Sequence, residues 1–298
     1  MKKYLPIIIV TFLWIWPPIF IKLFTQYFDN YTQNFYRFLS GALILIIISL
    51  IRNKQECIDC FKNIKKFFLP AIFMFLFQII WVAGIYLIDP TITSLITKAN
   101  VLFVLLISFI FFKDERKIIK SKTFILGASL AILGVIGVIL GKNSIHLEDF
   151  NLGAILILIA AIFWAFYVIS IKQVVKTTDP FVAASFSYSL AVPLFFILAL
   201  LFGDLTAITR APPSIITLLV LSGIFFVGIA NALNFESIKM IGASISTTFI
   251  LVTPFFTGIA SYFIFKELLT ITQLIFGLIL LIGCFILIRA ENHSLNTE

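Results

Sequence analysis

Eight long stretches of the chain contain no charged residue, and each is long enough to cross a lipid bilayer. They cover residues 4–21, 67–88, 123–141, 152–171, 180–203, 211–235, 240–265 and 268–288. A spanning helix needs about 20 predominantly apolar residues, and an uncharged run of about 18 is already a candidate. Two more stretches, 31–51 and 91–112, are interrupted only by Arg37 and by Lys98. We therefore predict ten transmembrane helices.

Composition excludes most other kinds of protein. Of the 298 residues, 61% are hydrophobic and only 12% are charged, whereas soluble domains have about 25% charged residues. The longest connection between the stretches, 52–66, is too short for a soluble domain. We predict an all-α polytopic membrane protein embedded in the lipid bilayer, with the first stretch as helix 1 rather than a cleaved signal peptide.

Lysine and arginine residues in the loops predict the orientation in the membrane. If both termini share one side, that side collects sixteen of them: Lys2, Lys3, Arg52, Lys54, Lys62, Lys65, Lys66, Lys113, Arg116, Lys117, Lys120, Lys122, Lys172, Lys176, Lys239 and Arg289. The opposite side has three, Lys142, Arg210 and Lys266. We expect a protein of the inner membrane with both termini in the cytoplasm. The same topology accounts for the net charge of +8, so no nucleic-acid partner is expected.

Several residues recur at nearly one spacing, 150 to 152 positions. They are the Trp-x7-Lys patterns of 14–22 and 164–172, the pair Glu115 and Glu267, and the pair Gly127 and Gly277. Three matches at nearly one offset indicate an internal duplication. Because five helices is an odd number, the second copy enters the membrane from the opposite face. We predict two inverted five-helix repeats, residues 1–142 and 143–298, with a substrate site at their interface.

Short motifs run through both copies in a characteristic order. They are Trp14 to Lys22, Arg37-Phe38, Gly41-Ala42, Lys113-Asp114-Glu115-Arg116, Gly242-Ala243-Ser244, Pro254 and Phe265-Lys266-Glu267. In this order the chain resembles the drug/metabolite transporter superfamily, specifically the ten-helix EamA-type transporters, over about residues 4 to 290. The resemblance implies a transporter of small solutes and favours export.

Two departures from that family alter the predicted cavity. The family usually has proline in the middle of helix 4, but residues 97–102 contain none. Helix 1 reads Trp-Ile-Trp-Pro-Pro at 14–18, where the family usually has Trp-Gly and small residues. The substrate of a relative therefore does not transfer to this chain.

Lys98 is the most informative candidate for substrate binding. It lies seven residues past Thr91, about 10 Å from the outer end of its span at 1.5 Å per residue. A cation at that depth costs roughly 2.5–3.5 kcal/mol, and no Asp or Glu lies well inside the ten spans. We predict that Lys98 binds an anionic group of the substrate. The alternatives are that it reaches the outer interface or pairs with Asp89.

Aromatic and amide side chains complete the predicted substrate site. Trp14, Trp81 and Trp164 lie within spans, where they can line a pocket for an apolar or cationic solute, although anchoring at the interface is the commoner use of Trp. Four polar residues in apolar runs can contact substrate or bond between helices: Gln78, Asn100, Asn231 and Asn234.

Five further residues are predicted to shape or gate the bundle: Arg37, Pro17, Pro254, Glu115 and Glu267. Each proline removes a backbone hydrogen bond and should kink its helix. The resembled family usually has Arg at position 37, which favours packing or gating over substrate choice, and we read the two glutamates as end-caps.

Small residues follow one face of the fifth stretch, at Gly127, Ala131, Gly134, Gly137 and Gly141. They predict close helix packing, either within the chain or with a second subunit, so we expect a monomer or a homodimer. Cys57 and Cys60 form one C-x-x-C motif without a second pair or a nearby His, and we expect no metal site and no cofactor.

Together these features predict a secondary transporter that moves a small organic metabolite by alternating access. The chain has no G-x-x-x-x-G-K-[ST] motif for ATP, and its spans lack an intramembrane catalytic set, so we expect no enzyme activity. Lys98 favours an amino acid or organic anion as substrate. Efflux of multidrug or cationic compounds is the alternative, and a channel is less favoured.

Overall fold

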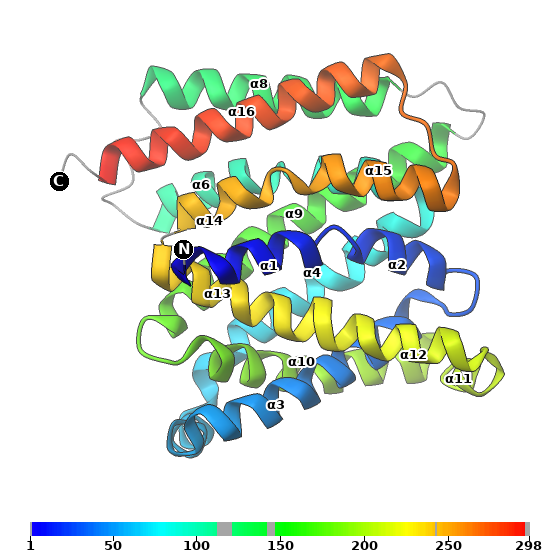
Figure 1. Ribbon diagram of the computed structural model, residues 1–298, viewed down its shortest axis with the longest axis vertical. Helices are drawn as coiled ribbons and strands as arrows, with labels where there is room; N and C mark the ends of the chain where they lie inside the picture. Colours follow the sequence, from blue (N-terminus) through cyan, green and yellow to red (C-terminus); the bar gives the residue numbers. More distant parts are fainter. Residues whose placement is uncertain (1, 112–120, 142–146, 242, 296–298) are drawn as a thin grey trace.

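The computed structural model describes residues 2–111, 121–141, 147–241 and 243–295 (Figure 1). This part of the chain contains ten helices long and apolar enough to cross a membrane. The predicted all-α architecture with ten membrane spans is therefore confirmed. In Figure 1 the N-terminus and the end of the last helix lie at the same side of the bundle. We call this side the termini face and the opposite side the far face.

Six spans are essentially single helices. They are α3 (Asn30–Lys62), α4 (Phe68–Leu87), α8 (Lys122–Leu140), α9 (Leu147–Val175), α10 (Pro180–Phe202) and α16 (Ile271–Leu295). A short 3₁₀ segment, η1 (Lys2–Tyr4), precedes the first span, and another, η2 (Ile64–Phe67), leads into α4.

The other four spans are interrupted near mid-membrane. Span 1 is α1 (Leu5–Leu13) and α2 (Pro17–Phe24), span 4 is α5 (Pro90–Thr97) and α6 (Asn100–Phe111), and span 9 is α14 (Ala243–Ile250) and α15 (Thr253–Phe265). Span 8 joins α12 (Pro213–Ser222) to α13 (Ala230–Ile241) through a π-helix, η4 (Gly223–Ile229), and follows the short α11 (Ala207–Arg210). Proline lies in the first turn of the second half of spans 1 and 9, at Pro17 and Pro254, but the interruptions of spans 4 and 8 contain no proline.

Several predicted boundaries are wrong because charged residues do not end these helices. Span 8 continues past 235 to Ile241, and α3 continues past 51 through most of the predicted loop 52–66. Arg52 and Glu236 lie 3.3 Å apart at the termini face, so each charge has a partner where the helices leave the apolar region. The backbone of α3 kinks at Asn53.

The closest helix pairs each join one helix of the first half to one of the second. These pairs are α8 with α16, α4 with α9, and α3 with α10, and Figure 1 shows the first along one edge of the molecule and the last along the other. One hydrophobic cluster runs through both halves. The two repeats are thus interlocked rather than separately packed.

The predicted small-residue stripe packs within the chain. A Cβ added at Gly134 would lie 2.5 Å from Leu280 Cα, and one added at Gly137 would overlap the Phe276 ring. Glycine is therefore required for α8 to approach α16 this closely. The expectation of a monomer or a homodimer stays a prediction.

Candidate functional site

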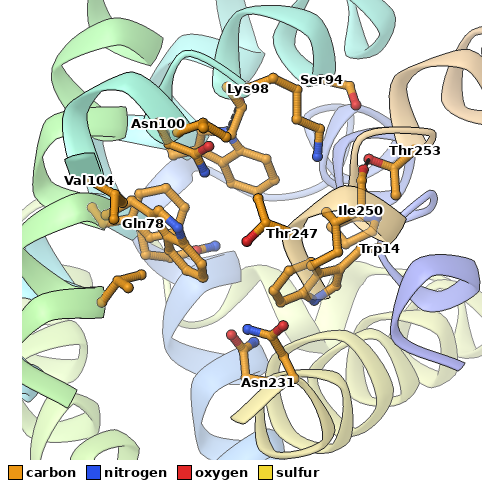
Figure 2. A pocket seen from close by; sticks show the side chains of 18 of the residues that line it. Trp14, Gln78, Ser94, Lys98, Asn100, Val104, Asn231, Thr247, Ile250 and Thr253 are labelled. Atoms are coloured by element: carbon orange, nitrogen blue, oxygen red, sulfur yellow. Dashed lines mark hydrogen bonds between the residues drawn. The ribbon is translucent and has the colours of Figure 1, made fainter. Parts of the chain in front are cut away.

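A cavity of about 200 Å³ lies at the centre of the bundle, where the interrupted spans meet (Figure 2). All seven residues predicted to bind substrate line it: Lys98, Asn100, Trp14, Gln78, Trp81, Trp164 and Asn231. Arg37 and Pro17 line it as well. The structure brings these residues together, and their role in binding stays a prediction.

Lys98 occupies the break in span 4. It caps the C-terminus of α5, and its N–H donates to Leu95 O at 3.0 Å in a tightened last turn. Its own carbonyl accepts from Val101 N–H at 3.2 Å and from the Cys284 thiol at 3.3 Å. The carbonyl that the break frees is therefore satisfied, which explains how this span is interrupted without a proline.

The Lys98 side chain is directed into the protein rather than to a membrane interface. It is 9% exposed and lines the cavity, as Figure 2 shows. Among the described residues that line the cavity, none is Asp or Glu. The ammonium group therefore faces a cavity that supplies no protein carboxylate.

The breaks in spans 1 and 9 have their own side-chain supports. Thr257 Oγ1 donates to Ile15 O at 3.0 Å across the two spans, and Thr253 Oγ1 donates to Ile250 O at 2.9 Å. Pro254 is buried in the first turn of α15, so the helix is interrupted next to it as predicted. Pro254 does not itself line the cavity, whereas Thr253 does.

Three half-helices begin at the cavity wall. The first residues of α2, α6 and α15 include Pro17, Asn100 and Thr253, which all line the cavity. A helix N-terminus carries a partial positive charge. These three ends and the two cations Lys98 and Arg37 make the cavity electropositive.

Aromatic rings form a continuous wall on one side of the cavity. The Trp14 and Trp164 rings meet edge to face at 5.9 Å, Phe77 lies 4.9 Å from Trp164, and Phe77 stacks on Trp81 at 5.7 Å. Trp14 and Trp164 are the pair related by the 150-residue offset. Their contact brings equivalent positions of the two repeats together at the centre of the molecule.

Trp81 is also tied to the broken span. Its Nε1–H donates to Thr97 Oγ1 at 2.9 Å, and Thr97 Oγ1 donates to Thr93 O at 2.7 Å. Thr97 is the residue before Lys98, so this chain of bonds holds the last turn of α5 in place. It was not evident from the sequence, because neither threonine interrupts the apolar pattern strongly.

Two asparagines give the cavity hydrogen-bond acceptors. The Asn231 Nδ2 group donates to Phe226 O at 3.2 Å and to Val227 O at 3.0 Å, and the π-helix makes both carbonyls available. This fixes the amide so that Asn231 Oδ1 is left buried without a partner, as is Asn234 Oδ1. Both residues line the cavity.

Glu267, one of the two predicted end-cap residues, does not line the cavity. Glu267 accepts a hydrogen bond from Ser261 Oγ where span 9 ends, and Lys266 beside it adopts a left-handed backbone with φ 58°. Glu115 lies outside the described residues, so its predicted role as an end-cap stays a prediction.

Asp29 and Asp179 mark the inverted repeat most clearly, and sequence reasoning missed them. They are 150 positions apart, and each accepts two backbone N–H bonds at the N-terminus of the second helix of its repeat, α3 or α10. Each also contacts the other half: Asp204 N–H donates to Asp29 Oδ2 at 2.9 Å, and Asp179 Oδ2 lies 3.6 Å from Arg52. A search at the known offset would have found the pair.

Comparison with known proteins assigns the family. The EamA-like transporter family matches the chain twice, at residues 1–140 and again at 151–289. The chain belongs to the EamA-like transporter family. An uncharacterized transporter of Haemophilus influenzae (strain ATCC 51907 / DSM 11121 / KW20 / Rd) is similar at 26% identity over 282 residues, covering 92% of this chain and 93% of the relative. A protein of known crystal structure shares the fold over 96% of both chains, with a TM-score of 0.66 and 15% identity.

This EamA-like protein is therefore a multi-pass membrane transporter built from two copies of the family unit. The resemblance inferred from its motifs is confirmed. The predicted boundary between residues 142 and 143 falls outside the described residues and stays a prediction.

Proposed function

We propose that this EamA-like transporter is a secondary transporter that carries a small organic anion or zwitterion, such as an amino acid, by alternating access of its two inverted halves. The observation that carries the proposal is Lys98, a buried cation on a mid-membrane helix break, facing a cavity whose described lining contains no acidic residue. An uncompensated cation inside a membrane protein is costly, and a bound anionic group would offset that cost.

The broken helices also favour a negatively charged group on the substrate. In secondary transporters, half-helix N-termini at mid-membrane point towards anionic substrate groups. Here α6 begins at Asn100, two residues after Lys98, so the partial positive charge of its N-terminus and the ammonium act on the same region. A carboxylate is attracted by both and accepts hydrogen bonds from the ammonium.

The amide oxygens favour a substrate that also carries a donor. Asn231 Oδ1 and Asn234 Oδ1 are buried without partners in the same cavity, and an ammonium or amide N–H of the solute can satisfy them. A buried acceptor without a donor costs about 1–3 kcal/mol. An amino acid supplies both the anionic group and the donor.

Cavity size separates this proposal from multidrug efflux. The volume of about 200 Å³ lies below the roughly 300–1,000 Å³ of pockets for drug-sized ligands. The aromatic wall of Trp14, Trp164 and Phe77 is what favours the second candidate, a small cationic compound held by cation–π contacts. Lys98 repels such a cation.

We also propose an inner-membrane location with cytoplasmic termini and transport outwards. The loop cations support this orientation, because sixteen lysines and arginines fall on the side of the termini and three on the opposite side, and cytoplasmic loops carry the excess of positive charge. The direction of transport rests on the family resemblance alone.

A thermal-shift screen of amino acids, organic acids, nucleotides and cationic dyes on purified protein tests the substrate class. Stabilisation by an amino acid or organic acid that is lost in Lys98→Ala supports the proposal. Stabilisation by cationic dyes, unchanged in Lys98→Ala, would reject it in favour of cation efflux.

A further inference from the structure

The first two turns of α3 bury an unusual number of polar groups between the central cavity and the far face. Gln33 and Asn34 are fully buried and Arg37 is 1% exposed. Arg37 lines the cavity, and Gln33 and Asn34 lie one turn closer to the far face, about 5 Å further along the helix axis. We call these three residues the far-side polar layer.

One polar atom of each residue in this layer is buried without a partner. Gln33 Nε2 donates to Tyr86 OH at 2.6 Å, and Asn34 Nδ2 donates to Asn30 O at 2.9 Å and Asn30 Oδ1 at 2.8 Å. The nitrogen sides of both amides are thus used, and Gln33 Oε1 and Asn34 Oδ1 are left without donors. Arg37 Nε donates to Ser222 Oγ at 3.2 Å, while its Nη1 has no acceptor.

The fold does not require these polar groups, as the second repeat demonstrates. The positions 150 residues later are Ala183, Ala184 and Ser187, all fully buried, and Ser187 Oγ donates to Ala183 O within its own helix at 2.8 Å. The same helix start therefore packs well with small side chains. An unpaired buried polar group is costly, so the polar layer needs a reason other than packing.

The unpaired atoms of this layer repeat the chemistry of the central cavity. Each set combines a cationic donor with two amide oxygens: Lys98 with Asn231 and Asn234 at the centre, and Arg37, which also lines the cavity, with Gln33 and Asn34 in the layer. Asn231 and Asn234 come from the second repeat, whereas the layer lies entirely on α3. Two sets of acceptors with the same chemistry, one on each side of Arg37 and Lys98, point to one class of ligand.

We propose that the far-side polar layer is a second binding station for the transported solute, entered when α3 parts from α4 and α12, the helices that hold Tyr86 and Ser222. Arg37 Nη1 pairs with the anionic group of the solute, and Gln33 Oε1 and Asn34 Oδ1 accept from its ammonium or amide N–H. The station rests on the proposed function, because it takes the same solute as the central cavity. The start of α10 offers no equivalent station, because Ala183 and Ala184 have no side-chain acceptor.

Close backbone contacts lie beside the layer. A Cβ at Gly223 would overlap Arg37 O, and one at Gly41 would lie 2.9 Å from Gly223 O. The backbones of α3 and η4 therefore touch across glycines, next to the Ser40 and Val227 side chains. A π-helix such as η4 is frequent at functional sites.

Thiol labelling tests the station with small charged reagents in place of the solute. The background variant carries Cys57→Ala, Cys60→Ala and Cys284→Ser, the last keeping a donor to Lys98 O. Asn34→Cys in this background is treated from the far face with an anionic methanethiosulfonate, bearing a sulfonate, or a cationic one, bearing trimethylammonium. We expect the anionic reagent to react about tenfold faster, because a buried guanidinium concentrates anions locally.

Two matched variants test whether Arg37 causes the preference for the anionic reagent. Arg37→Gln should abolish the preference for the anionic reagent, and Ala184→Cys, the inverted counterpart, should react slowly with both reagents from the termini face. Equal rates of the two reagents at Asn34→Cys, a preference that survives Arg37→Gln, or equally fast reaction at Ala184→Cys would each overturn the proposal. Gln33→Cys replaces Asn34→Cys if the latter does not fold.

Lys98→Cys in the same background distinguishes failure of the second binding station from failure of the proposed function. Labelling at Lys98→Cys without labelling at Asn34→Cys would contradict the second station alone. If neither position reacts from either face, the central cavity is not reached by solutes, and the proposed function fails together with the station.

Discussion

The two repeats share one backbone plan but carry different polar chemistry. Both begin their second helix with an aspartate cap, at Asp29 and Asp179, and both break their fourth helix at mid-membrane. Yet the cations Lys98 and Arg37 lie in the first repeat, and the free amide oxygens of Asn231 and Asn234 lie in the second. At an offset of 150, Asn231 and Asn234 correspond to Trp81 and Gly84. Duplication supplied the geometry, and divergence divided the donor and acceptor roles at the central cavity.

This division explains why the cavity has a defined polarity. A cavity lined by two identical halves would be symmetric about the axis that relates Trp14 to Trp164. With cationic groups from one repeat and acceptors from the other, the proposed zwitterion would bind in one orientation. The cavity can then keep its cationic side and its acceptor side while either half moves.

The largest expected effect comes from removing the cation of the first repeat. Lys98→Ala should reduce uptake of a carboxylate-bearing solute by about thirtyfold or more, since losing one partner of a buried charge pair costs about 2–5 kcal/mol. Lys98→Arg should restore part of the activity, because a planar fork replaces a compact ammonium. Initial uptake rates in proteoliposomes measure both. Wild-type uptake by Lys98→Ala and Lys98→Met would show that Lys98 does not contact the solute.

Removing an acceptor of the second repeat should have a smaller and more selective effect. Asn231→Leu should weaken binding of an amino acid about tenfold, because a hydrogen bond to a charged group contributes about 1.5–3 kcal/mol. The matching carboxylic acid without the amino group should bind as before. Thermal-shift titrations of both compounds measure this. Equal weakening for the two compounds would contradict separate donor and acceptor sides.

Glycines at two helix contacts should differ in their tolerance of alanine. Gly134→Ala should lower the melting temperature by about 3–8 °C, since its Cβ meets the Leu280 backbone at 2.5 Å. Gly277→Ala should change it little, because its Cβ meets only the Leu95 side-chain tip at 3.2 Å. A fluorescence melting curve of each variant decides the comparison. Similar melting temperatures for both would mean that α8 and α16 adjust their separation.

The two aspartate caps should contribute about equally to the stability of the protein. Their removal should have the smallest effect of the variants considered. Asp29→Ala and Asp179→Ala should each destabilise the protein by about 0.5–2 kcal/mol, the usual cost of losing an N-cap, while Asp29→Asn and Asp179→Asn should retain most of the stability. Denaturant unfolding in detergent measures all four variants. A large difference between Asp29→Ala and Asp179→Ala would show that the contacts to Asp204 and Arg52 dominate over capping.

Much of this architecture could be predicted because membrane spans leave a strong apolar signal. The number of spans, the inverted repeat and the residues of the cavity follow from apolar runs, one offset and the rare polar residues within them. The break in span 4 could not be predicted, because it depends on tertiary groups such as the Cys284 thiol and the Trp81 indole rather than on a local proline. Residues such as Thr247, Thr253 and Phe226 line the cavity but look ordinary in an apolar sequence.

Counterflow in proteoliposomes tests the central claim most directly. Vesicles preloaded with an unlabelled amino acid that stabilises the protein should transiently accumulate the same labelled compound, with a saturable rate in the wild type. The overshoot should disappear in Lys98→Met and persist at reduced height in Lys98→Arg. Flux that does not saturate would indicate a channel, and an undiminished overshoot in Lys98→Met would contradict an anion-binding cavity centred on Lys98.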